Sequence, residues 1–429
     1  MQGRSLPTAT SYATLSHCWG AGQPIKLTRS NNSALSRSIP FTQLPKTFKD
    51  AVQLALELDI RYIWIDSLCI VQDDLADWLQ ESLFMASVYY NGQVNIAATA
   101  SAGPEGGLFF PETLLRRPCL VDATWTGLLT PEKKGDGMAG SEPGDPFSLE
   151  QGRLDISGEQ QFFELVEHGP LNKRAWVLQE AVLSAKITHC AADQIWWSSS
   201  LLACNEPFPK RTPWRPGSNL HRSRADMTAQ FQESSPMLWV EYIRQFSALK
   251  LTVESDKLVA LAGIGEWFGR VNGISSESWA AGLWTEPSPT MFLGWGLVSI
   301  PRRPAQYRAP SWSWASIDGE VAFHKDVLQP ICDIIFVELE TNGGPFGKFD
   351  DGYMLVEAPL IPCFPFQHLE AGVETPTLGE PLFQYQGVII NLYPFDLTTP
   401  RPGTRQKAVI CLDDPSDIDR PSPSIKFLR

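Results

Sequence analysis

The sequence has 429 residues, of which 43% are hydrophobic and 19% are charged, and its formal net charge at pH 7 is -13. This composition allows a large buried core, and at roughly 150 residues per domain the length predicts two or three domains. The negative charge argues against a dedicated nucleic-acid binder, whose surface would be basic. No apolar run approaches the ~20 residues that a membrane-spanning helix needs, so we expect neither nucleic acid nor a membrane span.

The N-terminus lacks the basic-then-apolar pattern of a secretory signal. The eight cysteines are scattered and include no C-x-x-C pair, which is typical of a reduced, intracellular protein. The adjacent pairs His17-Cys18 and His189-Cys190 do not have the spacing of zinc ligands, so we expect no metal site.

Strands and helices alternate in the first third of the chain. Short apolar runs rich in β-branched and aromatic residues predict strands at 12–16, 61–66 and 93–100. Helical spacing of apolar residues lies between these runs. This alternation is typical of an α/β fold with a mostly parallel sheet flanked by helices.

Two helices are predicted between these strands. Thr47 is expected to begin the first, with Asp50 three residues on in a capping-box arrangement. Asp73 and Asp74 are expected to cap the second, which spans about 75–90.

Residues 101–168 interrupt the alternation with a glycine- and proline-rich stretch, which predicts a flexible insert. A helix is then predicted over "LNKRAWVLQEAVLS", after Pro170. The next two apolar runs, "KITHCA" and "QIWWSS", predict a pair of strands.

The rest of the chain has a different pattern. It predicts helices at 237–250 and 256–270, followed by short strands with turns. We therefore expect a first domain over residues 11–191 and an irregular α+β C-terminal extension over residues 192–429, helical and then β-rich.

Polar residues follow the predicted strands where each strand ends. In an open parallel sheet the carboxyl ends of the strands meet at one edge, and ligands bind there. We therefore expect these residues to share one site. The candidates for catalysis are His17, Asp66 and Cys69, and the candidates for substrate binding are Ser16, Trp19 and Asp73.

Ordinary structural roles compete with these functional ones. Cysteine is commonly a small buried hydrophobe, and aspartate at the start of a helix is commonly a cap. Asp66 is harder to explain in this way, because a carboxylate that closes an apolar strand needs backbone donors or a basic partner. Arg174 is one candidate for that partner.

The segment "RAWVLQE", residues 174–180, adds candidates on a predicted helix. Trp176 lies one turn before Glu180. An indole that desolvates a carboxylate raises its pKa, which suits general acid or base catalysis. Arg174 is a candidate for holding a phosphate or for steadying Asp66. The competing interpretation is a core tryptophan beside a surface glutamate.

Four segments together resemble the fungal heterokaryon-incompatibility (HET) domain in their order and spacing. They are "YATLSHCWG", "LPKTFKDAVQLALELDIRYIWIDSLCIVQDD", "DWLQESLFMASVYYNGQVNIAAT" and "RAWVLQE". The resemblance covers about residues 11–191. Downstream, "DKLVALAGIGEWF", "AAGLW" and "YRAPSWSWASIDG" resemble the extension that often follows this domain. The resemblance implies a cytoplasmic fungal protein of non-self recognition and regulated cell death.

The HET domain is thought to be similar to Toll/interleukin-receptor (TIR) domains, so the resemblance also implies a TIR-like sheet. In that comparison Glu180 takes the position of the glutamate that cleaves NAD in enzymatic TIR relatives. NAD would then be a substrate, and no cofactor is expected.

Three classes of function are compatible with these observations. The first is a cell-death effector that hydrolyses a nucleotide through Glu180. The second is a signalling module without catalysis, which assembles with further copies of itself or with a HET signalling partner. The third is an enzyme of a biosynthetic pathway, such as secondary metabolism, that acts on a small molecule with Cys69 as nucleophile and His17 as base.

Overall fold

The structure is a computed structural model. It describes residues 7, 10–20, 25–110, 119–122, 153–156, 162–199, 203–206, 209, 235–286, 293–298, 302, 304–323, 333–342, 344–357, 383–385 and 388–390. The chain divides into two compact units, residues 1–78 with 87–229 and residues 79–86 with 230–429. Each unit is described by itself below.

A six-stranded sheet forms the centre of the first unit, in the order β2-β1-β3-β6-β7-β8. The strands are β1 (Ala13–Ser16), β2 (Ile63–Ile65), β3 (Val94–Ala97), β6 (Lys186–Cys190), β7 (Ile195–Ser199) and β8 (Ala203–Asn205). Strands β2, β1, β3 and β6 run parallel, whereas β7 and β8 are antiparallel to their neighbours. The predicted α/β class and the predicted β6–β7 strand pair are thereby confirmed.

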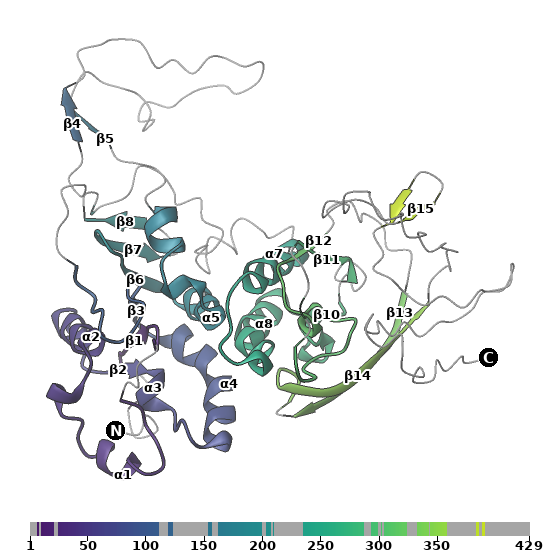
Figure 1. The fold of residues 1–429 in the computed structure, drawn as a ribbon, viewed down its shortest axis with the longest axis horizontal. Coiled ribbons are helices and arrows are strands. Elements are labelled where there is room, and N and C mark those ends of the chain that lie inside the picture. Colours follow the sequence, from purple (N-terminus) through teal and green to yellow (C-terminus); the bar gives the residue numbers. More distant parts are fainter. Residues whose placement is uncertain are drawn as a thin grey trace, which may run out of the picture. The chain divides into compact units, whose positions relative to one another are not determined.

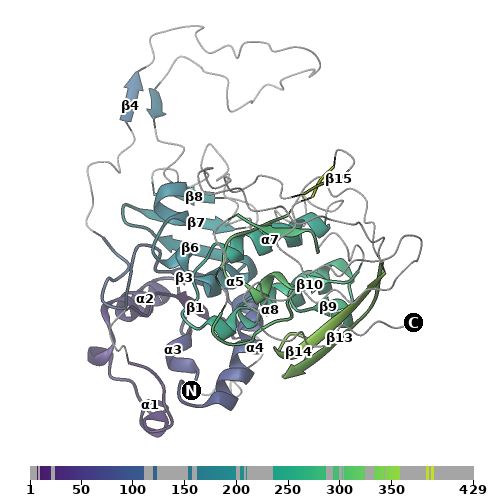
Figure 2. The same ribbon diagram turned by 45° about the vertical axis from the view of Figure 1, so that its right-hand side comes forward.

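Helices cover both faces of this sheet, α2 on one side and α5 on the other (Figures 1 and 2). The α-helices of the unit's described residues are α1 (Asn32–Leu35), α2 (Lys46–Glu57), α3 (Asp66–Cys69), α5 (Ala175–Leu183) and both ends of α4 (Leu75–Asn91). Phe48 of α2 packs with Leu15 and Ile96 in one buried cluster. Val177 of α5 packs with Ala97 in another. The two clusters are separate because successive strand residues point to opposite faces.

The capping box predicted at the start of α2 is wrong. The helix begins after Pro45, and no side chain caps it. The Asp50 carboxylate instead accepts a hydrogen bond of 2.8 Å from the backbone N–H of Leu108, which fastens the loop after β3 to α2. Asp74 does cap α4, by accepting from two backbone N–H groups of the first turn.

Two short strands lie within the predicted insert. They are β4 (Cys119–Asp122) and β5 (Arg153–Ile156), and they pair antiparallel. Most of residues 111–161 lie outside the described residues. The predicted flexibility of the insert concerns these residues and stays a prediction.

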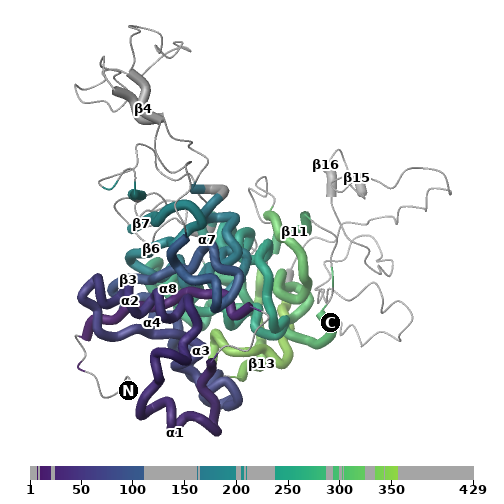
Figure 3. Tube along the Cα trace, turned by 60° about the vertical axis from the view of Figure 1, so that its left-hand side comes forward, coloured from purple at the N-terminus to yellow at the C-terminus, as the bar shows by residue number. Residues whose placement is uncertain are grey.

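Among its described residues, the second unit has the α-helices α7 and α8 and several small antiparallel sheets, and Figure 3 labels α7, α8, β11 and β13. The helices are α7 (Ser235–Ser247) and α8 (Val259–Asn272). The strand pairs are β9 (Trp279–Ala280) with β10 (Leu283–Trp284), β11 (Trp295–Leu297) with β12 (Val321–Phe323), β13 (Asp333–Asn342) with β14 (Lys348–Glu357), and β15 (Phe383–Tyr385) with β16 (Val388–Ile390). Two helices followed by short strands match the predicted pattern.

The turn between β9 and β10 is hydrogen-bonded to α7 and to the segment that contains Ser313 and Trp314. The carbonyl oxygen of Gly282 accepts hydrogen bonds from the indole N–H groups of Trp239 and Trp314, each at 3.1 Å. The Ser313 hydroxyl donates to the carbonyl oxygen of Ala281 at 2.6 Å. Ala281 is buried at a φ of +46°, a conformation that is uncommon outside glycine. These hydrogen bonds hold the turn in its strained conformation.

We expect Gly282→Ala to destabilise the protein by about 2–3 kcal/mol, from backbone strain together with overpacking. The residue has a φ of +89°, and a Cβ there would lie 2.8 Å from Leu258 and 2.9 Å from the Trp314 indole nitrogen. Gly344 is the matched control, since its φ is +87° and nothing lies within 4 Å of an added Cβ. Gly344→Ala should therefore cost only about 1 kcal/mol. Urea unfolding of both variants measures the difference, and equal losses would contradict the steric argument.

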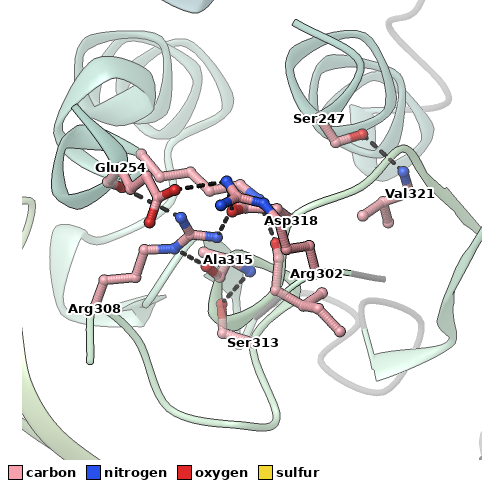
Figure 4. Close-up of polar contacts among 10 residues, drawn as sticks. Ser247, Glu254, Arg302, Arg308, Ser313, Ala315, Asp318 and Val321 are labelled. Carbon is pink, nitrogen blue, oxygen red and sulfur yellow. Dashed lines mark hydrogen bonds and ion pairs between the residues drawn. The ribbon is translucent and has the colours of Figure 1, made fainter. Parts of the chain in front are cut away.

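Three cationic side chains lie around Asp318 in the second unit, and Figure 4 shows two of them, Arg302 and Arg308. Its Oδ1 pairs with Arg308 and lies 3.7 Å from the Nζ of Lys257, and its Oδ2 lies 2.9 Å from Arg302. The side chains of Arg308 and Lys257 are only 3% and 5% exposed, whereas that of Arg302 is 67% exposed. Burial and the neighbouring Arg308 lower the pKa of Lys257 to about 7. The carboxylate thus compensates the buried guanidinium of Arg308 and, below pH 7, the protonated amine of Lys257.

Candidate functional site

The turn after β2 places Asp66 at the carboxyl edge of the parallel strands. Its Oδ2 accepts a hydrogen bond of 2.9 Å from the Trp19 indole, and its Oδ1 accepts one of 2.6 Å from the Ser67 backbone N–H. The Nδ1 of His17 lies 3.6 Å from Oδ1. The hydrogen-bond donors to this carboxylate are therefore an indole and a backbone amide, the imidazole lies near it, and Arg174 is not among these contacts.

His17 lies on the α2 side of the sheet. Its side chain is buried, and its ring meets Phe48 edge to face with the centroids 4.8 Å apart. Burial lowers the pKa of the imidazole, and Asp66 opposes this in part. Neither ring nitrogen hydrogen-bonds to a side chain in the described part of the chain. His17 is thus a neutral, apolar-packed imidazole rather than one half of a bonded pair.

Cys69 ends α3 and is exposed. Because the imidazole nitrogens of His17 bond no side chain among the described residues, the thiol–imidazole pair expected for a cysteine nucleophile does not form in this structure. Asp73 is also exposed, and its carboxylate accepts a hydrogen bond of 2.7 Å from the backbone N–H of Arg29. That contact holds the loop before α1.

Arg174 immediately precedes α5. Its guanidinium donates a hydrogen bond to the backbone carbonyl of His17, which ties the start of the helix to the end of β1. Two residues further on, the half-buried Trp176 meets Trp78 of α4 edge to face, with the centroids 6.4 Å apart. Arg174 therefore lies at the carboxyl edge of the sheet with a half-exposed side chain.

Glu180 lies on the α5 side of the sheet and is 4% exposed. Burial raises the pKa of its carboxyl to about 7, against the lowering effects of Arg174 and of hydrogen bonding with Ser16 and Tyr89. Its Oε2 has no hydrogen-bond partner in the described structure. The competing interpretation expected a surface glutamate beside a core tryptophan. The structure has the opposite arrangement, since Glu180 is buried and Trp176 is half-exposed. At pH 7 such a carboxyl is divided between its two protonation states and can accept or donate a proton.

The predicted catalytic residues are brought together only in part. His17 points to the α2 side and Glu180 lies on the α5 side, because the two neighbouring residues Ser16 and His17 face opposite ways at the end of β1. The charges of Asp66 and Arg174 act on both His17 and Glu180. The centre of the site is therefore Glu180, on which the charges of Asp66 and Arg174 act.

Two residues of this centre were not predicted from the sequence. Asn95 of β3 exchanges hydrogen bonds with Ser16 at 3.0 and 3.1 Å, and Tyr89 of α4 lies against Glu180. The available signal was Asn95 itself, since an amide in an otherwise apolar strand needs a hydrogen-bond partner. Tyr89 carried no such signal, because its position fits the apolar face of a helix.

Within the described residues, no group of three or more His, Cys, Asp or Glu side chains is placed to hold a metal ion. In the same part of the chain, every helix is too short or too polar to cross a membrane.

The fold and these contacts define an α/β domain with an acidic centre at the carboxyl edge of its parallel strands. Residues 12–180 match the family described as Heterokaryon incompatibility protein (HET), so this part of the chain belongs to that family. The match runs from β1 into α5 and ends at Glu180. No curated protein and no solved structure matches the chain. The HET resemblance is thereby confirmed, and the similarity to TIR domains stays a prediction.

Proposed function

We propose that the HET domain hydrolyses the N-glycosidic bond of NAD or a related nucleotide. Through this reaction the protein would act in the cytoplasm as a cell-death effector of non-self recognition. The observation that carries the proposal is Glu180, a buried carboxyl whose pKa is raised to about 7 at the carboxyl edge of the parallel sheet.

The chemistry suits such a group. When the bond between nicotinamide and ribose breaks, its electron pair leaves with the pyridinium nitrogen and an oxocarbenium-like centre forms at the sugar, by analogy with glycoside hydrolysis. A carboxylate stabilises that positive charge. Water then adds to the sugar carbon and loses a proton, which Glu180 can accept at neutral pH. The products are nicotinamide, ADP-ribose and a proton.

Neighbouring residues supply the other requirements. Arg174 is the cation of the site and can interact with a phosphate. Trp176 and Trp78 form a half-exposed aromatic pair one turn before Glu180, and indoles of this kind pack against planar bases. Because Glu180 is 4% exposed, neighbouring side chains must move when the ribose binds.

The test is release of nicotinamide from NAD by the purified protein, followed by chromatography, with other nucleotides as parallel substrates. We expect Glu180→Gln to reduce turnover by about 10²–10⁴-fold, the usual contribution of a positioned acid or base. The matched control is Glu167→Gln. Glu167 is also buried, with a pKa raised to about 7 by burial, but it lies outside this cluster. Full activity of Glu180→Gln would refute the catalytic role.

The same assay separates the other classes of function. A hydrolase that uses Glu180 should keep its activity in Cys69→Ser, because the thiol is exposed and His17 does not bond it. Loss of turnover in Cys69→Ser alone would instead support the biosynthetic enzyme with a cysteine nucleophile. No turnover of any nucleotide by the wild-type protein would support the signalling module without catalysis.

A further inference from the structure

Five polar side chains are buried together on the α5 side of the sheet. They are Thr14 and Ser16 of β1, Asn95 of β3, Tyr89 of α4 and Glu180 of α5, and each is at most 4% exposed. Buried polar groups are costly unless they are hydrogen-bonded. The hydrogen bonds of this cluster therefore determine how the carboxyl of Glu180 is held.

Asn95 fixes the orientation of Ser16. Its Oδ1 accepts a hydrogen bond of 3.2 Å from the Thr14 hydroxyl, and its Nδ2 donates one of 3.0 Å to the Ser16 Oγ. A serine hydroxyl has one proton to donate. With its oxygen accepting from the Asn95 Nδ2, Ser16 shares that one proton between the Asn95 Oδ1, 3.1 Å away, and Glu180, with which it also hydrogen-bonds.

Tyr89 is the second hydroxyl that meets Glu180. Its ring is 1% exposed and packs edge to face against Trp64, with the centroids 5.7 Å apart, so its orientation is fixed. Burial raises the pKa of the phenol well above 10, with Glu180 and Asp66 adding to the effect. The phenol therefore keeps its proton throughout the working pH range and acts on Glu180 only as a hydrogen-bond donor.

We propose that Tyr89 is a positioning residue of the Glu180 site: with Ser16 it holds one oxygen of the carboxyl and leaves Oε2 to exchange the proton. Oε2 is the oxygen without a partner among the described residues, so the two hydroxyls are assigned to Oε1. The catalytic use of Oε2 rests on the proposed hydrolysis, whereas the hydrogen-bonding assignment does not.

Other charged groups also act on this carboxyl. Arg174, which precedes α5, lowers the pKa of Glu180, and Asp66, which follows β2, raises it. Cys18 lies close enough for Glu180 to raise the pKa of its thiol. None of these groups is altered by a change at Tyr89, so a shift in the titration of Glu180 on removal of the phenol hydroxyl reports on that hydroxyl.

The experiment is Tyr89→Phe, which keeps the ring and removes the hydroxyl. Melting temperatures are measured from pH 5 to 9, with and without Glu180→Gln in the same protein. The difference between each pair of curves changes as the pH rises from the pKa of the unfolded chain and levels off near the pKa of Glu180 in the folded protein, and we take this upper limit as the midpoint for Glu180. Since a hydrogen bond to a carboxylate favours the ionised form, we expect Tyr89→Phe to move this midpoint upward by about one pH unit. The pH–rate profile should move by the same amount.

Tyr12→Phe is the matched control, because the Tyr12 hydroxyl donates to the carbonyl oxygen of Val88 at 2.7 Å, next to Tyr89, and has no part in the Glu180 cluster. Its midpoint should not move. Ser16→Ala, which removes the other donor with little change in volume, should move the midpoint upward as well and serves if Tyr89→Phe does not fold. Equal midpoints in the wild type, Tyr89→Phe and Ser16→Ala would overturn the assignment. The melting measurements decide it even if the protein hydrolyses no nucleotide, so its failure is distinct from that of the proposed function.

Discussion

Glu180→Gln is expected to melt at a higher temperature than the wild type at pH 8, although it loses nucleotide hydrolysis. The reason is the cost of burying a charged carboxylate. The pKa of Glu180 is raised from 4.5 to about 7 in the folded protein, chiefly by burial. A group tuned in this way for proton transfer lowers the stability of the fold above its pKa.

The direction in which stability changes with pH follows from the proton equilibria of Glu180 in the unfolded and in the folded protein. The unfolded chain loses the Glu180 proton near pH 4.5, whereas the folded protein keeps it until about pH 7. Wild-type stability therefore falls by roughly 3 kcal/mol between these values and stays level above them. Glutamine has no such dependence, but its amide N–H₂ lacks a partner at the Oε2 position, which costs roughly 1–2 kcal/mol.

Compared with the wild type, the free energy of unfolding of Glu180→Gln should be about 1–2 kcal/mol higher at pH 8 and slightly lower at pH 5. Melting curves at the two pH values, measured by differential scanning calorimetry, test this crossover. Glu167→Gln should show a similar dependence on pH, because burial also raises the pKa of Glu167 to about 7, but it should keep its activity. A Glu180→Gln protein that is less stable than the wild type at both pH values would show that the carboxyl is a structural partner.

Asp318→Asn is expected to destabilise the second unit by about 3–5 kcal/mol, the usual result of removing one partner from a buried ion pair. The substitution keeps the shape of the side chain but removes the negative charge that faces Arg308 and Lys257. Lys257 keeps its hydrogen bond to the carbonyl oxygen of Ile317, and Arg308 keeps its bond of 2.6 Å to the carbonyl oxygen of Ala315. The loss of stability in Asp318→Asn therefore comes from the missing negative charge.

Arg302→Gln is the control for this prediction. Arg302 also pairs with Asp318, but its side chain is 67% exposed, and exposed ion pairs contribute roughly 1 kcal/mol or less. Urea unfolding followed by tryptophan fluorescence measures both variants. If Asp318→Asn cost no more than Arg302→Gln, water would be screening the cluster and the buried charges would need no compensation.

Local sequence patterns predicted the elements of the first unit well, because apolar periodicity decides whether a segment can bury one face. Long-range contacts determined the hydrogen-bond partners and backbone conformations that local patterns could not predict. Asp50 has the spacing of a helix cap, yet its carboxylate bonds Leu108, which is 58 residues away. Ala281 takes a positive φ because Ser313, from a distant loop, bonds its carbonyl oxygen. Neither partner can be identified from neighbouring residues.

In the candidate site, too, local patterns predicted one part of the arrangement and long-range packing decided the other. The polar ends of β1 and β2 do meet at one edge, because the strands are parallel neighbours. The face taken by each side chain was decisive for His17 and Glu180, which lie on opposite sides of the sheet. Alternation along a strand already implies that Ser16 and His17 diverge. Which of the two would meet Glu180 depended on the packing of α5, which the sequence pattern did not specify.

Helix α4 runs unbroken from Leu75 to Asn91, yet its residues 79–86 belong to the second unit while both of its ends belong to the first. A single cut in the chain cannot separate the two units. A fragment of residues 1–229 would carry eight residues of the second unit, and a fragment of residues 230–429 would lack them. Chimeras between relatives must therefore exchange residues 79–86 together with residues 230–429, because swapping at one junction mixes the parts of both units.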